Sequence, residues 1–208
     1  MIELFYAPTP NGRKISIMLE EAKINYKITE VNLNKDEQFK PEFLKVNSYG
    51  KIPAIIDHDR ELTLIESGAI LIYLARKSNQ FLPKENETRI FEWLMFQMGN
   101  VGPMFGQHHH FHHYNSGKSK YAEERFFENS IRIYKVLDKA LTANNFLAGK
   151  DYTIADIATF PWIARHGWHD IGLKKYENLN RWYETISQRP LVIKGYDCLN
   201  KGEKIPKS

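Results

Sequence analysis

One short segment constrains the fold of this chain more than any other. Residues 49–56 read Tyr-Gly-Lys-Ile-Pro-Ala-Ile-Ile, and residues 64–68 read Leu-Ile-Glu-Ser-Gly. The first stretch is typical of a buried strand entered through proline, and the second is typical of a helix start. Because Pro53 has no N–H group, Ile52 keeps an unpaired backbone donor and acceptor at the mouth of the strand. If the Ile52–Pro53 bond is cis, these groups point into a cleft.

The predicted helix over Glu66–Ser78 begins beside that strand. The N–H groups at Glu66 and Ser67 have no partner within the helix, and the helix dipole adds positive potential there. A carboxylate is therefore favoured at this position. Together the strand and the helix start predict a pocket for a peptide-like anion. An ordinary strand–turn–helix without a ligand is the alternative that the motif leaves open.

The spacing of apolar residues predicts the architecture around this pocket. Alternation indicates strands and a helical period indicates helices, which gives a β-α-β unit at the start of the chain. The expected elements are strands over Ile2–Tyr6, Tyr26–Val31, Ala54–Asp57 and Leu62–Leu64, with helices over Gly12–Ile24 and Glu66–Ser78. This order is typical of an α/β thioredoxin-like domain with helices on both faces of one sheet.

The strand pattern stops at residues 79–87, where Phe-Leu-Pro-Lys interrupts the chain. We therefore predict a thioredoxin-like domain over residues 1–80 and an all-α domain over residues 87–208. Helices are expected over Thr88–Gly99 with a continuation past Pro103, and over Lys120–Thr142, Ile154–Trp168 and Leu179–Gln188. Proline inside a helix removes a hydrogen bond and clashes with the preceding turn, so the first helix should kink at Pro103 and lean over the cleft. Thr153 and Asp156 form a capping-box pattern, which is a folding device.

The pocket motif resembles the glutathione site of the glutathione transferase superfamily. The resemblance extends over nearly the whole chain, through Phe5–Lys14 at the start and Tyr152–Ile157 in the second half. The opening Ala-Pro-Thr-Pro-Asn-Gly, the run Gly102–His113 and Arg132 are similar to the bacterial nu class. That class is described as disulfide-bond oxidoreductases that use glutathione. The resemblance therefore implies glutathione, reduced or oxidised, as a co-substrate.

The composition is that of an ordinary soluble globular protein. The 208 residues are 42% hydrophobic and 26% charged, which suffices for one ample core or two small ones. The net charge is +4, but Lys and Arg are scattered among acidic residues, which favours anionic small molecules over nucleic acid. The first residues do not resemble a signal peptide, and no segment approaches the ~18 apolar residues of a membrane span. We expect a cytoplasmic protein with neither a membrane nor a nucleic-acid partner.

The chain contains one cysteine, Cys198, far in sequence from the pocket motif. A redox cycle between two cysteines of the chain is therefore excluded. Any thiol chemistry must use a thiol that the ligand supplies. Cys198 itself is expected to be a small core hydrophobe rather than a nucleophile.

A ligand thiol must lose its proton to attack, because a free thiol with a pKa of about 8.5 is mostly protonated at neutral pH. The turn Thr9–Gly12 offers groups for this task, since Pro10 suits a helix start and Asn11 can act as a cap or as a side-chain donor. The resemblance places Asn11 where related classes carry a catalytic Ser or Cys. An amide cannot be a nucleophile, so we expect Asn11 to orient the sulfur and Thr9 to offer a hydroxyl donor. A turn that only caps the helix is the alternative.

The resemblance also implies which residues hold the tripeptide. Gln38 is expected at the glycyl end, and Ile52, next to Pro53, should pair its backbone with the cysteinyl unit as an added strand does. Glu66 and Ser67 should hold the γ-glutamyl amine and carboxylate.

Two basic side chains are candidates for carboxylates of the ligands. Lys51 could neutralise one carboxylate, although a solvated lysine is an equally good interpretation. Arg132, on a later helix, is carried over as the partner of a second glutathione, because a guanidinium pairs with a carboxylate through two hydrogen bonds. Tyr6 ends the first strand one place too early for the tyrosine that activates the thiol in other classes, so we expect it in the core or the cleft wall.

Histidines are concentrated in one run of the sequence. The run contains His108, His109, His110, His112 and His113. Clustered imidazoles suggest Zn, Ni or Cu. No cysteine is near, and consecutive helical residues point in different directions, so we expect no metal site and keep metal handling as an alternative. The nu-class resemblance instead favours a cleft wall that faces a second glutathione or the substrate.

These observations predict a homodimeric enzyme that reduces disulfides by thiol exchange between ligands, with two glutathiones or one oxidised glutathione in each cleft. The homodimer follows from the resemblance alone. A glutathione transferase or peroxidase that acts on electrophiles or organic peroxides is the second hypothesis. A non-catalytic glutathione-binding regulatory module is the third, because the sequence shows no acid–base dyad and no activated nucleophile.

Overall fold

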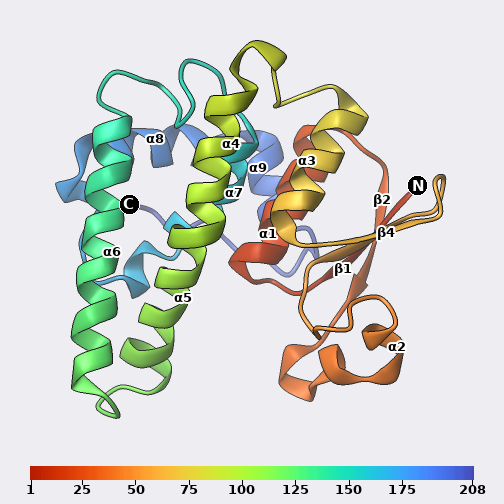
Figure 1. The fold of residues 1–208 in the computed structure, drawn as a ribbon, viewed down its shortest axis with the longest axis horizontal. Coiled ribbons are helices and arrows are strands. Elements are labelled where there is room, and N and C mark those ends of the chain that lie inside the picture. Colours follow the sequence, from red (N-terminus) through yellow and green to blue (C-terminus); the bar gives the residue numbers. More distant parts are fainter.

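The computed structural model describes all 208 residues, which form a sheet-containing region and a helical region side by side (Figure 1). The first region contains β1 (Ile2–Tyr6), α1 (Pro10–Glu21), β2 (Tyr26–Glu30), α2 (Pro41–Leu44), β3 (Ala54–Asp57), β4 (Leu62–Ile65) and α3 (Ser67–Ser78). The second contains α4 (Glu87–Phe96), α5 (Gly102–His109), α6 (Lys120–Ala140), α7 (Ile154–Ile163), α8 (Glu177–Ser187) and α9 (Pro190–Tyr196). None of the helices combines the length and apolarity needed to span a membrane.

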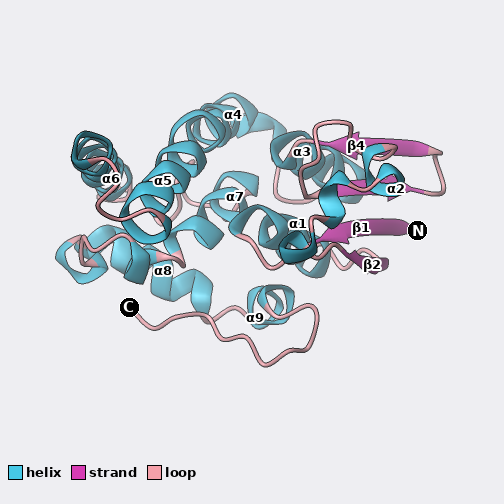
Figure 2. Cartoon of the chain, turned by 90° about the horizontal axis from the view of Figure 1, so that it is seen from below, coloured by secondary structure: helices cyan, strands magenta, loops and turns pink.

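The four strands form one mixed sheet in the order β2-β1-β3-β4. β1 pairs with β2 in parallel, as the predicted β-α-β unit requires, and β3 is antiparallel to both β1 and β4. Alternate residues of β1, such as Leu4, are buried, and Phe5 points to the other face, where its ring lies 5.9 Å from that of Phe43 in α2. Figure 2 shows α1 and α3 between the strands and helices α4 to α8, with α2 on the side of the strands. Helices on both faces confirm the thioredoxin-like prediction.

Local sequence sets both ends of α1. Thr9 caps the helix because its Oγ1 accepts a hydrogen bond from the backbone N–H of Gly12 at 3.1 Å, and Pro10 follows at the first helical position. The cap is therefore Thr9 and not Asn11. The helix ends before the predicted Ile24, because Lys23 adopts a left-handed conformation with φ 54° and directs the chain away from the helix axis.

The long helix that begins at residue 87 changes its winding before Pro103. A π-helical turn, η4 (Gln97–Val101), joins α4 to α5, and Pro103 lies in the first turn of α5. Proline is tolerated there because the first N–H groups of a helix have no intrahelical partner. The irregularity that we predicted at Pro103 is thus accommodated by the turn before it.

Helix α7 ends at Ile163, five residues before the predicted end at Trp168. Pro161 lies in its last turn and removes a hydrogen bond, after which a separate 3-10 turn covers His166–Trp168. The capping box of α7 is confirmed, since Thr153 and Asp156 exchange hydrogen bonds with each other's backbone or side chain. Helix α9, which the sequence pattern did not predict, packs against α1.

Asp156 should contribute strongly to stability. Asp156→Ala is expected to lower the free energy of unfolding by about 3 kcal/mol, because it removes the cap and leaves buried N–H donors of Leu147, Thr153 and Trp182 without an acceptor. Urea unfolding followed by circular dichroism measures the change. Asp151→Ala, at an exposed position before the same helix, is the control and should cost less than about 0.5 kcal/mol. Equal stability of the two variants would contradict the role given to Asp156.

Candidate functional site

A cavity of about 330 Å³ lies where the two regions meet. Its wall includes Asn11 and Lys14 of α1, Glu66 and Ser67 at the start of α3, Gln97 of η4 and Trp162 of α7. Pockets of this size typically hold small ligands. The structure thus brings three predicted site residues together, Asn11, Glu66 and Ser67, although they are far apart in sequence.

The start of α3 presents polar groups to this cavity. The helix begins at Ser67 rather than at the predicted Glu66, which instead precedes it as the cap residue. Glu66 has φ 67°, a conformation that L-residues rarely adopt and that costs about 1–3 kcal/mol. Strain of this kind is concentrated at functional sites. Ser67 is 8% exposed and Glu66 is exposed, so both can meet a ligand at the open end of the helix.

Asn11 is held by a hydrogen bond from the opposite region of the protein. The indole Nε1–H of Trp162 donates to Asn11 Oδ1 at 3.1 Å. Since an indole can only donate, this bond fixes which end of the amide is the oxygen and turns the Nδ2 donors away from Trp162. The structure therefore favours Asn11 as a side-chain donor. Sequence reasoning missed Trp162, because its partner is 151 positions away.

Lys14 is a second residue that sequence reasoning missed. Its Nζ donates to Gln97 Oε1 at 2.8 Å and to Ser67 Oγ at 3.2 Å, and the residue is only 1% exposed. Burial lowers the pKa of Lys14 to about 7, although the negative charge of Glu66 opposes this shift. The sequence held a signal, because Lys14 lies one turn before Met18 on the apolar face of α1.

The remaining residues predicted to hold the tripeptide do not line this cavity. Thr9 has its Oγ1 engaged as the cap of α1. The Ile52–Pro53 bond is cis, with Ile52 half-buried and Pro53 buried. Gln38 lies in a 3-10 turn, Glu37–Phe39, and its backbone carbonyl is close to Gly50.

The two predicted basic residues also lie outside the cavity. Lys51 is exposed, with its Nζ 5.8 Å from the centroid of the Tyr49 ring. Arg132 is exposed on α6, on the side opposite to the buried Ile133 and Leu137. Within one chain, the structure therefore does not bring Arg132 together with Asn11, Glu66 and Ser67.

The histidine run lies behind the cavity wall. The ring of His109 is 6.1 Å from that of Trp162 and 5.1 Å from that of His169. His112 and His113 meet Asp170, which comes from the segment after α7, and their ligand atoms lie within 4.8 Å of one another. A hydrogen bond between His112 Nε2 and Asp170 Oδ2, at 2.8 Å, accounts for this approach without a metal ion.

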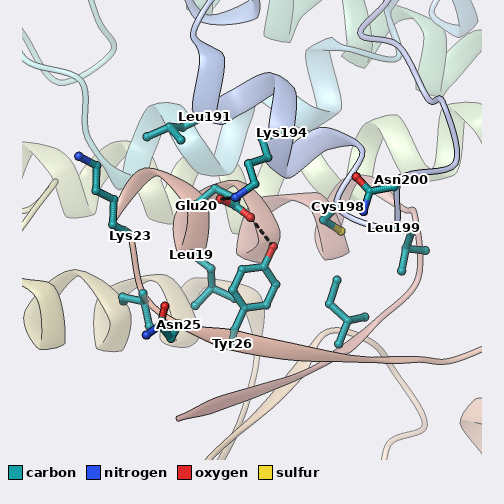
Figure 3. A pocket seen from close by; sticks show the side chains of 12 residues that line it. Leu19, Glu20, Lys23, Asn25, Tyr26, Leu191, Lys194, Cys198, Leu199 and Asn200 are labelled. Carbon is teal, nitrogen blue, oxygen red and sulfur yellow. Dashed lines mark hydrogen bonds and ion pairs between the residues drawn. The ribbon is translucent and has the colours of Figure 1, made fainter.

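A larger cavity, about 810 Å³, lies elsewhere and contains Cys198 (Figure 3). It is bounded by α1, β2 and α9, and none of the predicted ligand-binding residues lines it. Burial raises the pKa of the Cys198 thiol, which disfavours the nucleophilic thiolate. Glu20 is already engaged there by Lys194 and by the hydroxyl of Tyr26. The predicted separation of Cys198 from the site chemistry agrees with this arrangement.

Comparison with known proteins identifies the family of the chain. The family model for the N-terminal domain of glutathione S-transferase matches residues 2–76, and the model for the C-terminal domain matches residues 94–190. The chain belongs to the glutathione S-transferase family. The disulfide-bond oxidoreductase YfcG of Escherichia coli is 45% identical to this chain over 197 residues, which cover 91% of this chain and 92% of YfcG. YghU, a second disulfide-bond oxidoreductase of that bacterium, is 36% identical, over 93% of this chain and 73% of its own.

Solved structures of this family contain glutathione. A glutathione transferase of Burkholderia graminis, with two glutathione molecules bound per subunit, superposes with a TM-score of 0.91 at 39% identity, over 97% of this chain and 89% of its own. A Pseudomonas putida transferase, with one glutathione disulfide bound per subunit, superposes with a TM-score of 0.88 at 39% identity, over 94% of this chain and 90% of its own. These neighbours support the prediction of glutathione, reduced or oxidised, as the co-substrate of this protein.

The buried histidines should make this protein sensitive to acid. Burial lowers the pKa of His109 to about 3, and it also lowers the pKa values of His108 and His169. Below about pH 6.5 the unfolded chain takes up protons that the folded protein does not, so the free energy of unfolding falls by about 1.4 kcal/mol per pH unit for each such histidine. Urea unfolding at about pH 7 and about pH 5.5 measures this loss.

A variant isolates the contribution of one imidazole. Between these two pH values, the free energy of unfolding of His109→Gln should fall by about 1 kcal/mol less than that of the wild type. His110→Gln, at an exposed position of the same run, is the control and should keep the wild-type dependence. An unchanged loss in His109→Gln would contradict this account of the buried histidines.

Proposed function

We propose that this protein is a glutathione-dependent disulfide reductase in which the reacting sulfur atoms all belong to bound ligands. One observation carries the proposal: the cavity joins an amide donor, Asn11, to the Glu66–Ser67 helix start, and the one cysteine of the chain lies in another cavity. The 45% identity to an Escherichia coli disulfide-bond oxidoreductase supports this choice among glutathione-dependent reactions.

Glutathione is proposed to bind through residues of the N-terminal domain. Its γ-glutamyl amine pairs with Glu66 and its α-carboxylate accepts hydrogen bonds from Ser67 and the first N–H groups of α3. The cysteinyl backbone pairs with Ile52 beside Pro53, and Gln38 and Lys51 contact the glycyl end. The sulfur then lies near the start of α1, where Asn11 Nδ2 and Thr9 Oγ1 donate to it and lower the pKa of the thiol.

The reaction is an exchange of sulfur partners in two steps. The thiol loses its proton to solvent, and the thiolate attacks one sulfur of the substrate disulfide, which forms a mixed disulfide with glutathione and releases one substrate thiolate. A second glutathione thiolate attacks the glutathione sulfur of this intermediate and releases the other substrate thiolate. Each leaving thiolate takes a proton from water. The substrate gains two electrons, and two glutathiones become one oxidised glutathione.

The proposal includes two glutathiones, or one oxidised glutathione, in each cleft. The Burkholderia graminis and Pseudomonas putida transferases, which hold these two forms, support this stoichiometry. We also propose a cytoplasmic location, because a chain with one cysteine and a need for reduced glutathione suits a reducing compartment. A homodimer is proposed from the family resemblance alone. Arg132 remains a predicted partner of the second glutathione. Its side chain is exposed on α6 and is therefore accessible to an anion.

Removal of the Asn11 amide tests the proposed thiolate stabilisation. Asn11→Ala should lower kcat/KM for a mixed disulfide with glutathione by at least about tenfold, because one preorganised donor to the sulfur is lost. Steady-state consumption of reduced glutathione measures the rate, and circular dichroism reports the fold. Asn145→Ala, at an exposed position, is the control. If the two variants turn over at the same rate, Asn11 does not stabilise the thiolate.

The cysteine variant tests whether the protein itself supplies a reacting sulfur. Cys198→Ser should keep wild-type turnover within about twofold, since the thiol lies in another cavity and its pKa is raised by burial. Loss of turnover in a folded Cys198→Ser protein would overturn the mechanism.

A comparison of substrates separates the possible reactions. The turnover of a disulfide, an aryl halide and an organic peroxide, measured on one preparation, distinguishes reduction of disulfides from conjugation and peroxide reduction. Tight binding of oxidised glutathione without any turnover would identify a binding module instead.

A further inference from the structure

The inner end of the glutathione cavity contains a positive charge with no acidic partner. Lys14 Nζ contacts Gln97 Oε1 and Ser67 Oγ, with the sulfur of Met98 at 3.9 Å, and it forms no ion pair within 4.0 Å. A buried ammonium group is unfavourable unless an anion compensates it. The hydrogen-bond partners of Lys14 are all neutral, and Glu66 only partly offsets the effect of burial on its pKa, so an anionic group of a ligand would stabilise the charged lysine.

Gln97 adds an independent observation at the same place. The residue is fully buried, and because its Oε1 accepts from the lysine, its amide Nε2 must face the other way. That Nε2 has no hydrogen-bond partner in the protein. Buried amide donors are almost always paired, and an unpaired one calls for a ligand or a water molecule. Gln97 belongs to the π-helical turn η4, and such turns occur frequently at functional sites.

We propose that Lys14 is a positioning residue that makes the site selective for thiols carrying a free α-carboxylate on a γ-glutamyl group. This inference rests on the proposed glutathione-dependent function. Lys14 can only donate, so its bond to Ser67 Oγ occupies an acceptor position of that hydroxyl. The Ser67 O–H, which points to the sulfur of Met98 at 3.8 Å, can exchange this weak acceptor for the carboxylate. The charge thus acts on the ligand through Ser67. The amine of the same γ-glutamyl group is left to Glu66.

Binding should be coupled to the uptake of a proton. The pKa of Lys14 is about 7 in the empty site because of burial, and a carboxylate placed beside it raises this pKa. Glu66 is the acidic group that faces it, from the start of α3. The neighbours from η4 and α7, Gln97, Met98 and Trp162, are neutral. Since the charged lysine favours the anion, affinity for the carboxylate falls as the pH rises through about 7.

Calorimetry with S-methylglutathione tests this inference, because this ligand has no thiol that titrates. Titrations in buffers with different heats of ionisation, at about pH 6, 7 and 8, should show proton uptake by the wild type and a loss of affinity of about tenfold between the extremes. Lys14→Met should bind about tenfold more weakly at the lowest pH, with no proton uptake and a flat pH profile. Lys23→Met, at an exposed position after α1, is the control and should behave as the wild type.

A second ligand separates positioning from a structural role. An analogue of S-methylglutathione that lacks the γ-glutamyl α-carboxylate should bind the wild type and Lys14→Met equally, without proton uptake. If Lys14→Met loses the same affinity for both ligands, Lys14 only maintains the fold of the site. If Lys14→Met does not fold, two other measurements decide whether Lys14 acts on the carboxylate through Ser67. These are the binding of the two ligands by Ser67→Ala and the proton uptake of the wild type.

The outcomes for the two proposals are distinct. If the wild type fails to bind S-methylglutathione at every pH, the glutathione-dependent function itself is wrong. If it binds without proton uptake, and Lys14→Met binds as tightly, the function stands and the role of Lys14 is wrong.

Discussion

Helix α1 is enclosed by the sheet on one side and by α7 and α9 on the other, and this enclosure determines how the two domains meet. The closest approach is at Gly195 of α9, where a Cβ would lie 2.6 Å from the Cα of Ile17. Glycine is therefore required at that contact. Ser16 Oγ donates to the Gly195 carbonyl at 2.7 Å, and Arg13 Nε donates to that of Tyr196 at 3.3 Å. The same helix carries Asn11 and Lys14 into the cavity, so the contact between the domains also positions the chemistry.

This arrangement suits the proposed exchange of thiols at a site without a protein nucleophile. Beside the carboxylate of Glu66, the groups that face the cavity include an amide, a hydroxyl, an ammonium group and a helix N-terminus, and these four stabilise negative charge. None of them needs to form a covalent bond with the substrate. A tightly packed boundary holds each donor in place, as the bond between Trp162 and Asn11 illustrates, so little reorganisation is needed when charge develops on sulfur.

Sequence reasoning succeeded where the information was local. The strand over Ala54–Asp57 and the helix after Glu66 were predicted nearly to the residue, because proline, alternation and a helix start mark them within a few positions. It failed where the deciding contact was distant. The bond from Trp162 to Asn11 and the contact of Gln97 with Lys14 join residues 151 and 83 positions apart, and no periodicity reports such pairs. Arg132 illustrates a further limit, since a motif carried over from relatives does not determine which face of α6 the side chain occupies.

The bond between the indole of Trp162 and the amide of Asn11 has a practical consequence. Trp162 is only 8% exposed and forms part of the cavity wall, with its Nε1–H committed to the residue proposed to contact the sulfur. Any molecule that enters the cavity must alter the polarity around this ring or the strength of its hydrogen bond. The protein therefore contains an intrinsic fluorophore at its binding site, and the emission of that tryptophan can report occupancy without an added label.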